Sequence, residues 1–392
     1  METFDELIDQ LQKLLDSSVQ NWFFGAGVSF ESNIPLMYDL TKRVEVLVNE
    51  EESETSKDIY KSLKEDLPTE CHIEHILSHI SDMIALAERS ASKQCYATGV
   101  CYTKEQLHKL YTALIKFIGT TIRYGYRSEN HGLGISEKIG TQEDPIVEIE
   151  HHRRFLKALF GGRANLERRS RISFFTSNYD TLIEDALGLE RKLAVDGFSG
   201  GAMAYWNPNQ EFETSRYGNR NHYKVHKLHG SVDWYHDEEF GLIRSRYGAK
   251  YLNNPSQILI YPQAKKYVEA QKDPFAVLLG RFRKALARTE DNILVSCGHS
   301  FGDAHINSEI LAALQSPKNK TTLLIFSKEK ATGLSEILNE WMSNKLICKK
   351  IFIATQHGIY NGGPERQNYS GDEINWWTFN GLTDFLLNEA SL

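Results

Sequence analysis

The apolar positions of the chain alternate between short continuous runs and stripes at helical spacing. Phe4 to Leu15 carries a helical stripe, and the run Trp22–Phe24 that follows is typical of a buried strand. The same alternation returns after His152. Strands are predicted at 171–176, 223–228, 258–261, 293–297, 322–326 and 350–354, and helices at 155–160, 181–187, 273–286, 305–314 and 335–346. Strands separated by helices predict an α/β fold, in which a parallel sheet is covered by helices on both faces.

The region between these two parts has a different pattern. From Asn49 to Glu150 the apolar residues repeat at helical spacing, as in Ile73 to Ile84 and Leu107 to Ile122, and we find no comparable strand signal. We therefore expect residues 1–48 and 151–392 to form one sheet domain, with residues 49–150 as a helical insertion. Within the last part, His357–Asp372 is predicted to be a long surface loop before a final helix at 382–387.

A glycine-rich turn follows the first predicted strand directly. Gly25-Ala26-Gly27-Val28-Ser29 comes after Phe24 and precedes a predicted helix at 40–48. Glycines in such a turn let the backbone approach a pyrophosphate, as in dinucleotide-binding folds. The α/β domain is therefore predicted to be Rossmann-like, although this short motif alone is also typical of an ordinary tight turn.

Three more polar motifs follow predicted strands. Thr176, His229 and Gly298 each come after such a strand, as Gly25 does. Ligands of open parallel sheets bind beyond the carboxyl ends of the strands, so these motifs are expected to meet in one crevice. There Asn178 could hold a water or a ribose hydroxyl, and His229 could accept a proton. Taken singly, Asn178 could instead cap a helix and His229 could be a hydrogen-bonded turn residue.

Composition and charge restrict the class of protein. The 392 residues carry a formal net charge of −7, so the protein lacks the overall positive charge that is typical of nucleic-acid-binding proteins. The arginines at 163–171 are expected to be a solvated connection. No apolar run is long enough to span a bilayer, and the acidic start Met1-Glu-Thr-Phe-Asp-Glu6 lacks the pattern of a secretory signal. Five scattered cysteines indicate reduced thiols. We therefore expect a cytoplasmic protein.

The four motifs, in this order, resemble those of the sirtuin family of NAD-consuming enzymes. The resemblance implies that Gly25, Ala26, Gly27 and Ser29 bind the NAD pyrophosphate. It places Thr176, Asn178 and Asp180 at the nicotinamide ribose and its pocket, and it makes Asn178 and His229 the catalytic residues. Gly298, Ser300 and, on a weaker match, Ser327 would contact the adenosine half.

The chain departs from the protein-deacylating sirtuins at three places. Pro35-Leu-Met-Tyr38 lacks the family's Asp and Arg, and Tyr261-Pro-Gln263 replaces the strand that binds acyl-lysine. No cysteine lies between Cys101 and Cys297, so the family's four-cysteine zinc site cannot form there and no zinc is expected. A polar helical face is also favoured over a metal site for Cys71, His72, His75 and His79.

The run Gly298-His-Ser-Phe-Gly-Asp-Ala-His-Ile306 and the late segment Trp376-Trp-Thr-Phe379 resemble the bacterial sirtuin-like proteins of anti-phage defence, which cleave NAD. The resemblance implies an NAD glycohydrolase that releases nicotinamide and ADP-ribose. A protein deacylase and a non-catalytic NAD or ADP-ribose sensor remain as alternatives. An enzyme that depletes NAD needs control, so we expect a homo-oligomer, or a separately encoded partner such as a HerA-type ATPase or an Argonaute-like sensor. The helical insertion is expected to carry such contacts.

Overall fold

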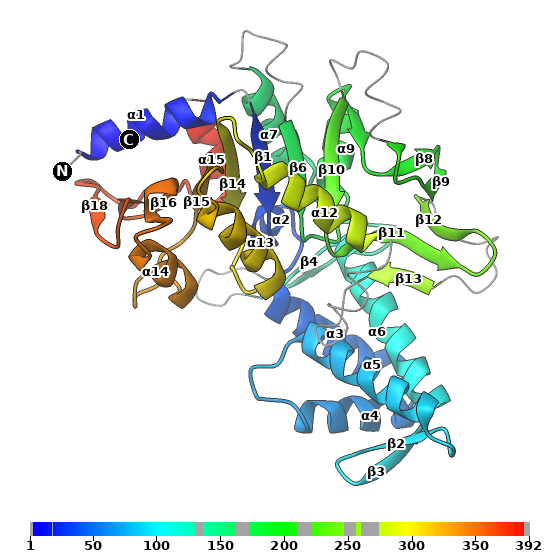
Figure 1. The fold of residues 1–392 in the computed structure, drawn as a ribbon. Coiled ribbons are helices and arrows are strands. Elements are labelled where there is room, and N and C mark those ends of the chain that lie inside the picture. The colour runs from blue at the N-terminus through cyan, green and yellow to red at the C-terminus, as the bar shows by residue number, and fades with distance from the viewer. Residues whose placement is uncertain are drawn as a thin grey trace.

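The computed structural model describes residues 3–17, 19–129, 136–161, 172–210, 222–246, 256–259 and 274–387 (Figure 1). The arginines at 163–171, the segment 261–263 and Asp273 lie outside these residues. No helix in the described ranges is both long and apolar enough to cross a membrane.

A large sheet forms the centre of the molecule. Within the described residues it has nine strands in the order β18-β17-β16-β15-β14-β1-β6-β10-β7. The central strand β1 (Gln20–Phe24) pairs in parallel with β14 (Asn292–Cys297) and β6 (Ile172–Thr176). The remaining strands are β7 (Leu193–Val195), β10 (His222–Lys227), β15 (Thr321–Phe326), β16 (Ile351–Thr355), β17 (Gly358–Asn361) and β18 (Arg366–Asn368). The predicted α/β, Rossmann-like fold with a parallel-dominated sheet is confirmed.

Helices cover both faces of this sheet, which explains the continuous apolar run in β1. Trp22 and Phe24 lie in one hydrophobic cluster and Phe23 lies in another. Successive side chains of a strand point to opposite faces, so a strand with two buried faces needs apolar residues throughout. The first cluster includes residues of α1 (Phe4–Leu15), α7 (Glu150–Gly161), α9 (Leu182–Leu189) and α15 (Phe379–Leu386). The second includes α12 (Phe275–Leu286), α13 (Ala304–Gln315) and α14 (Glu336–Ser343).

Four helices form a body that projects beyond the end of the sheet at which α2 (Gly27–Phe30) lies (Figure 1). They are α3 (Met37–Glu51), α4 (Glu54–Glu65), α5 (Ile73–Arg89) and α6 (Lys104–Tyr124). These helices share a third hydrophobic cluster, which also contains Tyr179, Leu182 and Val232 from the sheet domain. The helical body is thus packed directly against the segments that follow β6 and β10.

Residues 49–150, in which we found no comparable strand signal, contain short strands besides the helices. An antiparallel hairpin joins α5 to α6, formed by β2 (Gln94–Ala97) and β3 (Val100–Thr103), and β4 (Tyr126–Arg127) pairs with β5 (Lys138–Ile139). The first hairpin turns at Thr98 and Gly99, which both have positive φ. Strands this short, with one exposed face, contain too few apolar residues to show a period of two.

A second, antiparallel sheet lies beside the first and was not predicted. Its order is β13-β11-β12-β9-β8. The strands are β8 (Phe198–Gly200), β9 (Met203–Trp206), β11 (Gly230–Asp237), β12 (Gly241–Ser245) and β13 (Ser256–Leu259). The strand predicted at 258–261 therefore belongs to this antiparallel sheet and not to the parallel one.

The prediction of a long surface loop at 357–372 was also wrong. Strands β17 and β18 continue the main sheet in antiparallel orientation, next to β16 and after the short helix η2 (Cys348–Lys350). Glu329, which follows β15, holds them in place: it forms an ion pair with Arg366 and accepts a hydrogen bond from the Tyr360 hydroxyl at 2.8 Å. Ile359 and Tyr360 also pack into the hydrophobic clusters on the two faces of the sheet, so both polar and apolar contacts hold this edge.

Candidate functional site

Two glycine turns interlock at the carboxyl ends of β1 and β14. The Gly25 N–H donates to the Cys297 carbonyl at 3.0 Å, and the Gly27 N–H donates to the Gly298 carbonyl at 2.9 Å. A Cβ on Gly25 would lie 2.4 Å from the Gly298 oxygen, so no larger residue fits there. Gly298 has φ +66°, and a Cβ on it would lie 2.5 Å from the Val28 nitrogen. Both motifs therefore require glycine for the same close approach of two backbones.

The segment after β6 is tied to the first glycine turn. Thr176 donates its hydroxyl to the Phe24 carbonyl at 3.1 Å and accepts the Asn178 N–H at 2.9 Å. The Asn178 side-chain amide donates to the Gly25 carbonyl and to the Ser29 hydroxyl, both at 3.0 Å. These two bonds use both amide protons, so the side-chain oxygen of Asn178 is left to accept from a ligand or a water.

Ser29 and Asp180 are bonded to one another inside the protein. The Ser29 hydroxyl is 1% exposed and donates to the Asp180 carboxylate at 2.8 Å. The other oxygen of Asp180 accepts the Leu182 N–H at 3.0 Å, at the start of α9. In this structure the two side chains brace the turn on which Asn178 lies. Ala26 is exposed at the surface of the same turn.

His229 lies in the turn between β10 and β11, next to the segment of Asn178. Lys227 is paired with Thr176, and the Leu228 N–H donates to the Thr176 carbonyl at 2.8 Å. The His229 Nε2 is 2.7 Å from the Asp303 carboxylate, at the start of α13. Asp303 was not among the predicted site residues. The available signal was its position five residues after Gly298 and just before the helix predicted at 305–314, where an N-cap is expected.

The remaining predicted residues lie at the same end of the sheet. Ser300 is exposed in the turn after β14, and its hydroxyl accepts the Gly302 N–H at 3.4 Å. Ser327 follows β15 and donates its N–H to the Ala354 carbonyl at 3.1 Å. The segments that follow β1, β6, β10, β14 and β15 thus all lie at this end of the sheet.

A second imidazole, that of His299, lies beside this group. Its ring contacts Phe23 and Phe301 edge-on, with ring centroids 4.7 and 4.8 Å apart. Burial lowers the pKa of His299 to about 4, which outweighs the opposite effect of Asp303. At neutral pH His299 is therefore uncharged and does not form an ion pair with Asp303. The Asp303 carboxylate contacts His229 instead.

A buried lysine, Lys227, contacts the segment that carries Asn178 and Asp180. Lys227 is 1% exposed, donates to the Asp180 carbonyl and lies 3.5 Å from the Glu184 carboxylate. Burial raises the pKa of Glu184 to about 7, although Lys227 and Arg246 act in the opposite direction. The bond from Lys227 holds the backbone carbonyl of Asp180, and loss of this buried charge would leave Glu184 without its partner, which is strongly destabilising.

The helical body is bonded to these segments as well. The Tyr179 hydroxyl donates to Glu74 on α5 at 2.6 Å, and the Val232 N–H donates to the Tyr179 carbonyl at 2.9 Å. Arg123 on α6 donates to the Val232 carbonyl at 2.6 Å. Both the Asn178 segment and the strand after His229 therefore contact the helices directly.

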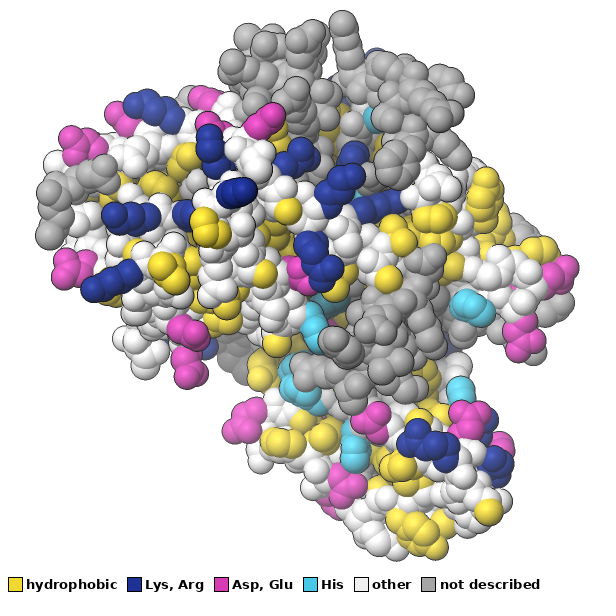
Figure 2. Space-filling view, viewed as in Figure 1, with side chains coloured by type: hydrophobic (Ala, Val, Ile, Leu, Met, Phe, Trp, Pro, Cys, Tyr) yellow, Lys and Arg dark blue, Asp and Glu magenta, His cyan; other side chains and the backbone are white. Residues whose placement is uncertain are grey.

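The described residues contain no group of three or more His, Cys, Asp or Glu side chains arranged to hold a metal ion. Of the histidines around the start of α5, His75 accepts the His72 N–H at 3.2 Å and His79 lies 3.5 Å from Asp66. On the face of the molecule drawn in Figure 2, histidine side chains (cyan) occur from the sheet domain into the helical body.

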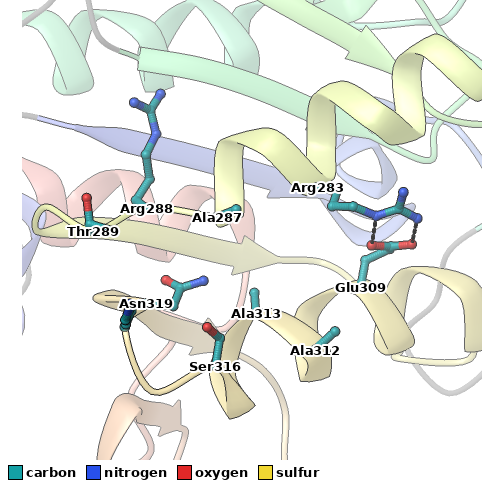
Figure 3. Close-up of a pocket in the computed structure, with 10 residues that line it drawn as sticks. Arg283, Ala287, Arg288, Thr289, Glu309, Ala312, Ala313, Ser316 and Asn319 are labelled. Atoms are coloured by element: carbon teal, nitrogen blue, oxygen red, sulfur yellow. Dashed lines mark hydrogen bonds and ion pairs between the residues drawn. The ribbon is translucent and has the colours of Figure 1, made fainter.

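A separate pocket of about 290 Å³ lies between α12 and α13. Arg283 and Glu309 face one another across it and form a hydrogen bond of 2.7 Å (Figure 3). Arg288 and Asn319, which also line it, precede β14 and β15, so the pocket lies at the amino ends of these strands, opposite the glycine turns. Lys and Arg side chains gather over this region in Figure 2, but the pocket is not part of the candidate site.

Buried histidines predict how stability depends on pH. His152 on α7 is 1% exposed, and burial lowers its pKa to about 4, below the value of about 6.5 in an unfolded chain. The stability linked to the uncharged form of His152 is fully present above pH 6.5 and is lost as the pH falls toward 4. Urea denaturation at pH 7 and at pH 4.5 measures this loss. The decrease in the free energy of unfolding from pH 7 to pH 4.5 should be about 2–3 kcal/mol smaller in His152→Gln than in the parent. The same change at the exposed His108 should leave the pH dependence unchanged.

A comparison with protein-family models supports the resemblance. The model described as "SIR2-like domain" matches residues 172–348, from β6 to η2. This range includes Asn178, His229 and Gly298, while the Gly25 turn lies before it. No curated protein matches the chain significantly. The family match supports a sirtuin-like family, whose SIR2-like domains use NAD and are generally parts of NAD-dependent enzymes.

Proposed function

We propose that this protein is an NAD hydrolase that breaks the bond between nicotinamide and ribose. The observation that carries the proposal is the placement of Asn178 and His229 directly after the neighbouring strands β6 and β10, at the edge of the sheet where the two glycine turns interlock. A module that only binds a nucleotide needs the turns, but it needs neither a positioned amide oxygen nor a histidine paired with a carboxylate. The SIR2-like match supports NAD as the nucleotide, because SIR2-like domains use NAD.

The proposed reaction uses the two side chains in sequence. When nicotinamide leaves, the C–N bond breaks and the ribose carbon takes on positive, oxocarbenium character. A water that donates to the Asn178 side-chain oxygen forms the new C–O bond, and His229 takes up the proton that this water releases. Binding of the distant adenosine and pyrophosphate supplies free energy to orient the reacting bond. Nicotinamide and ADP-ribose are the products.

Product analysis tests this proposal. We expect purified protein incubated with NAD alone to yield nicotinamide and ADP-ribose, separated by liquid chromatography. A second incubation adds an acetyl-lysine peptide, and a third uses ADP-ribose in place of NAD and measures binding by calorimetry. Cleavage that occurs only with the peptide would favour a deacylase. Binding of ADP-ribose without any cleavage of NAD would favour a non-catalytic sensor.

We further propose that the protein depletes NAD as the effector of a bacterial anti-phage defence system. This rests on the resemblance of its motifs to such proteins and on the departures from the deacylases described above. Unregulated depletion would kill the host, so activity would depend on assembly into a homo-oligomer or on a separate HerA-type ATPase or Argonaute-like sensor. If the free protein is inactive, the assays above require the activated assembly.

Assembly through the helical body gives a prediction. Tyr96 and Val100 on the β2–β3 hairpin are apolar and exposed, at 69% and 48%. They can be changed without uncovering Tyr179 or Val232, which deletion of α5 and α6 would expose. We expect Tyr96→Asp combined with Val100→Asp to lower the assembled mass in light scattering. An unchanged mass in the folded double variant would show that this hairpin carries no protomer contact.

A further inference from the structure

The carboxylate of Asp303 makes two kinds of contact at once. One oxygen caps α13 by accepting the N–H groups of His305 at 3.0 Å and Ile306 at 3.3 Å. The other oxygen lies 2.7 Å from the His229 Nε2. Because the first oxygen is fixed by the helix, the second has a fixed direction. The Asp303 and His229 side chains are 8% and 15% exposed, so water competes little for this contact.

This geometry determines which nitrogen of His229 carries the proton. An ionised carboxylate only accepts hydrogen bonds, so the nitrogen that faces it, Nε2, must be the donor. In neutral imidazole the other nitrogen, Nδ1, then holds the lone pair. Within the part of the chain that the structure describes, the polar contact of the His229 ring is that of Nε2 with Asp303. Nδ1 is therefore the atom available to accept a proton from a ligand.

We propose that Asp303 is a positioning residue, which holds His229 as the Nε2–H tautomer and thereby makes Nδ1 the general base. The inference rests on the proposed NAD hydrolysis, and it adds a residue and an atom to it. Once His229 has accepted the proton, the adjacent carboxylate also stabilises the resulting imidazolium.

Replacement by asparagine gives a sharp test because asparagine is also a good N-cap. In Asp303→Asn, the amide oxygen can go on accepting from the two N–H groups of α13. The amide NH₂ then faces the His229 Nε2, which must become an acceptor, and the proton moves to Nδ1. The folded variant would therefore carry the wrong tautomer. Asp303→Ser also keeps a cap, but its side chain is too short to hold His229 in either tautomer.

The experiment combines histidine NMR with kinetics. Long-range ¹⁵N–¹H spectra of ¹⁵N-histidine-labelled protein, with the His229 signal assigned from its absence in His229→Ala, report the tautomer without any substrate. We expect Nε2–H in the parent and Nδ1–H in Asp303→Asn. The kcat for NAD cleavage should fall by about 10²–10⁴-fold in Asp303→Asn, and by less in Asp303→Ser. KM should change little in either.

A double-mutant cycle separates positioning from a structural role. In the His229→Ala background, Asp303→Asn should have no further effect on kcat, because the residue acts only through His229. An equal loss in both backgrounds, an unchanged kcat in Asp303→Asn, or an Nδ1–H tautomer in the parent would each overturn the assignment. If the parent does not cleave NAD, the proposed function fails, while the spectra still decide the role of Asp303.

Discussion

Alanine at His229 or at Asn178 is expected to lower kcat for NAD cleavage by about 10²–10⁴-fold each. His229 and Asn178 are both only partly buried, so neither belongs to the apolar core. His229→Ala removes the base that accepts the proton of the water. Asn178→Ala removes the oxygen that orients this water, together with two hydrogen bonds to the Gly25 turn. Nucleotide affinity should therefore fall more in Asn178→Ala than in His229→Ala.

Steady-state kinetics, circular dichroism and calorimetric binding of ADP-ribose distinguish these effects. The matched controls are His108→Ala and Asn209→Ala, at exposed positions outside the site, and both should cleave NAD at the parental rate. A His229→Ala or Asn178→Ala variant that keeps the parental kcat under activating conditions would contradict the mechanism. Loss of ADP-ribose binding in His229→Ala would instead assign this residue to binding.

The parallel core was predictable because its signal is local. Each strand of the pair β1 and β14 is buried on both faces, so every position must be apolar or internally bonded, and the run Trp22–Phe24 shows this directly. The meeting of the motifs was predictable for a similar reason: the carboxyl ends of neighbouring parallel strands lie at one edge. Knowing where Gly25 and Gly298 follow strands is enough to place both at that edge.

The antiparallel additions were not predictable from apolar periodicity. Strands β17 and β18 are held by the contacts of Arg366 and Tyr360 with Glu329, which lies on a different segment of the chain. Each of these strands has only three or four residues, so the buried Ile359 and Tyr360 of β17 are too few to show a period of two. The strands of the β2–β3 hairpin are also only four residues long.

Pairing within the site also depends on tertiary structure. The sequence placed Asp303 before a helix, which is sufficient to predict a cap, but its second oxygen reaches His229 only because β10 and β14 lie in one sheet. Likewise, Ser29 was expected to face a pyrophosphate from its place in the motif. Its bond with Asp180 joins two loops whose distance the sequence does not contain.

Gly298→Ala is expected to destabilise the protein and to remove nucleotide binding together. A Cβ here would lie 2.5 Å from the Val28 nitrogen and 2.8 Å from the Gly27 carbonyl carbon, and both are backbone atoms that cannot rotate away. The residue also has φ +66°, which costs a residue with a Cβ about 1–2 kcal/mol, and overpacking adds about 1–3 kcal/mol. We therefore expect the free energy of unfolding to fall by about 2–5 kcal/mol in urea denaturation.

The matched control is Gly280→Ala in α12, where an added Cβ meets nothing within 4 Å. This change should stabilise the protein by about 0.5–1 kcal/mol, because alanine favours a helix interior more than glycine does. In Gly298→Ala the two turns must separate, because the Gly25 and Gly27 N–H groups donate to the Cys297 and Gly298 carbonyls. This separation moves the whole Gly25–Ser29 turn away from the position in which it would receive a pyrophosphate. Calorimetry with ADP-ribose at a temperature where the variant is folded isolates this effect from stability. Parental affinity in folded Gly298→Ala would mean that the interlocked turns do not form the nucleotide site.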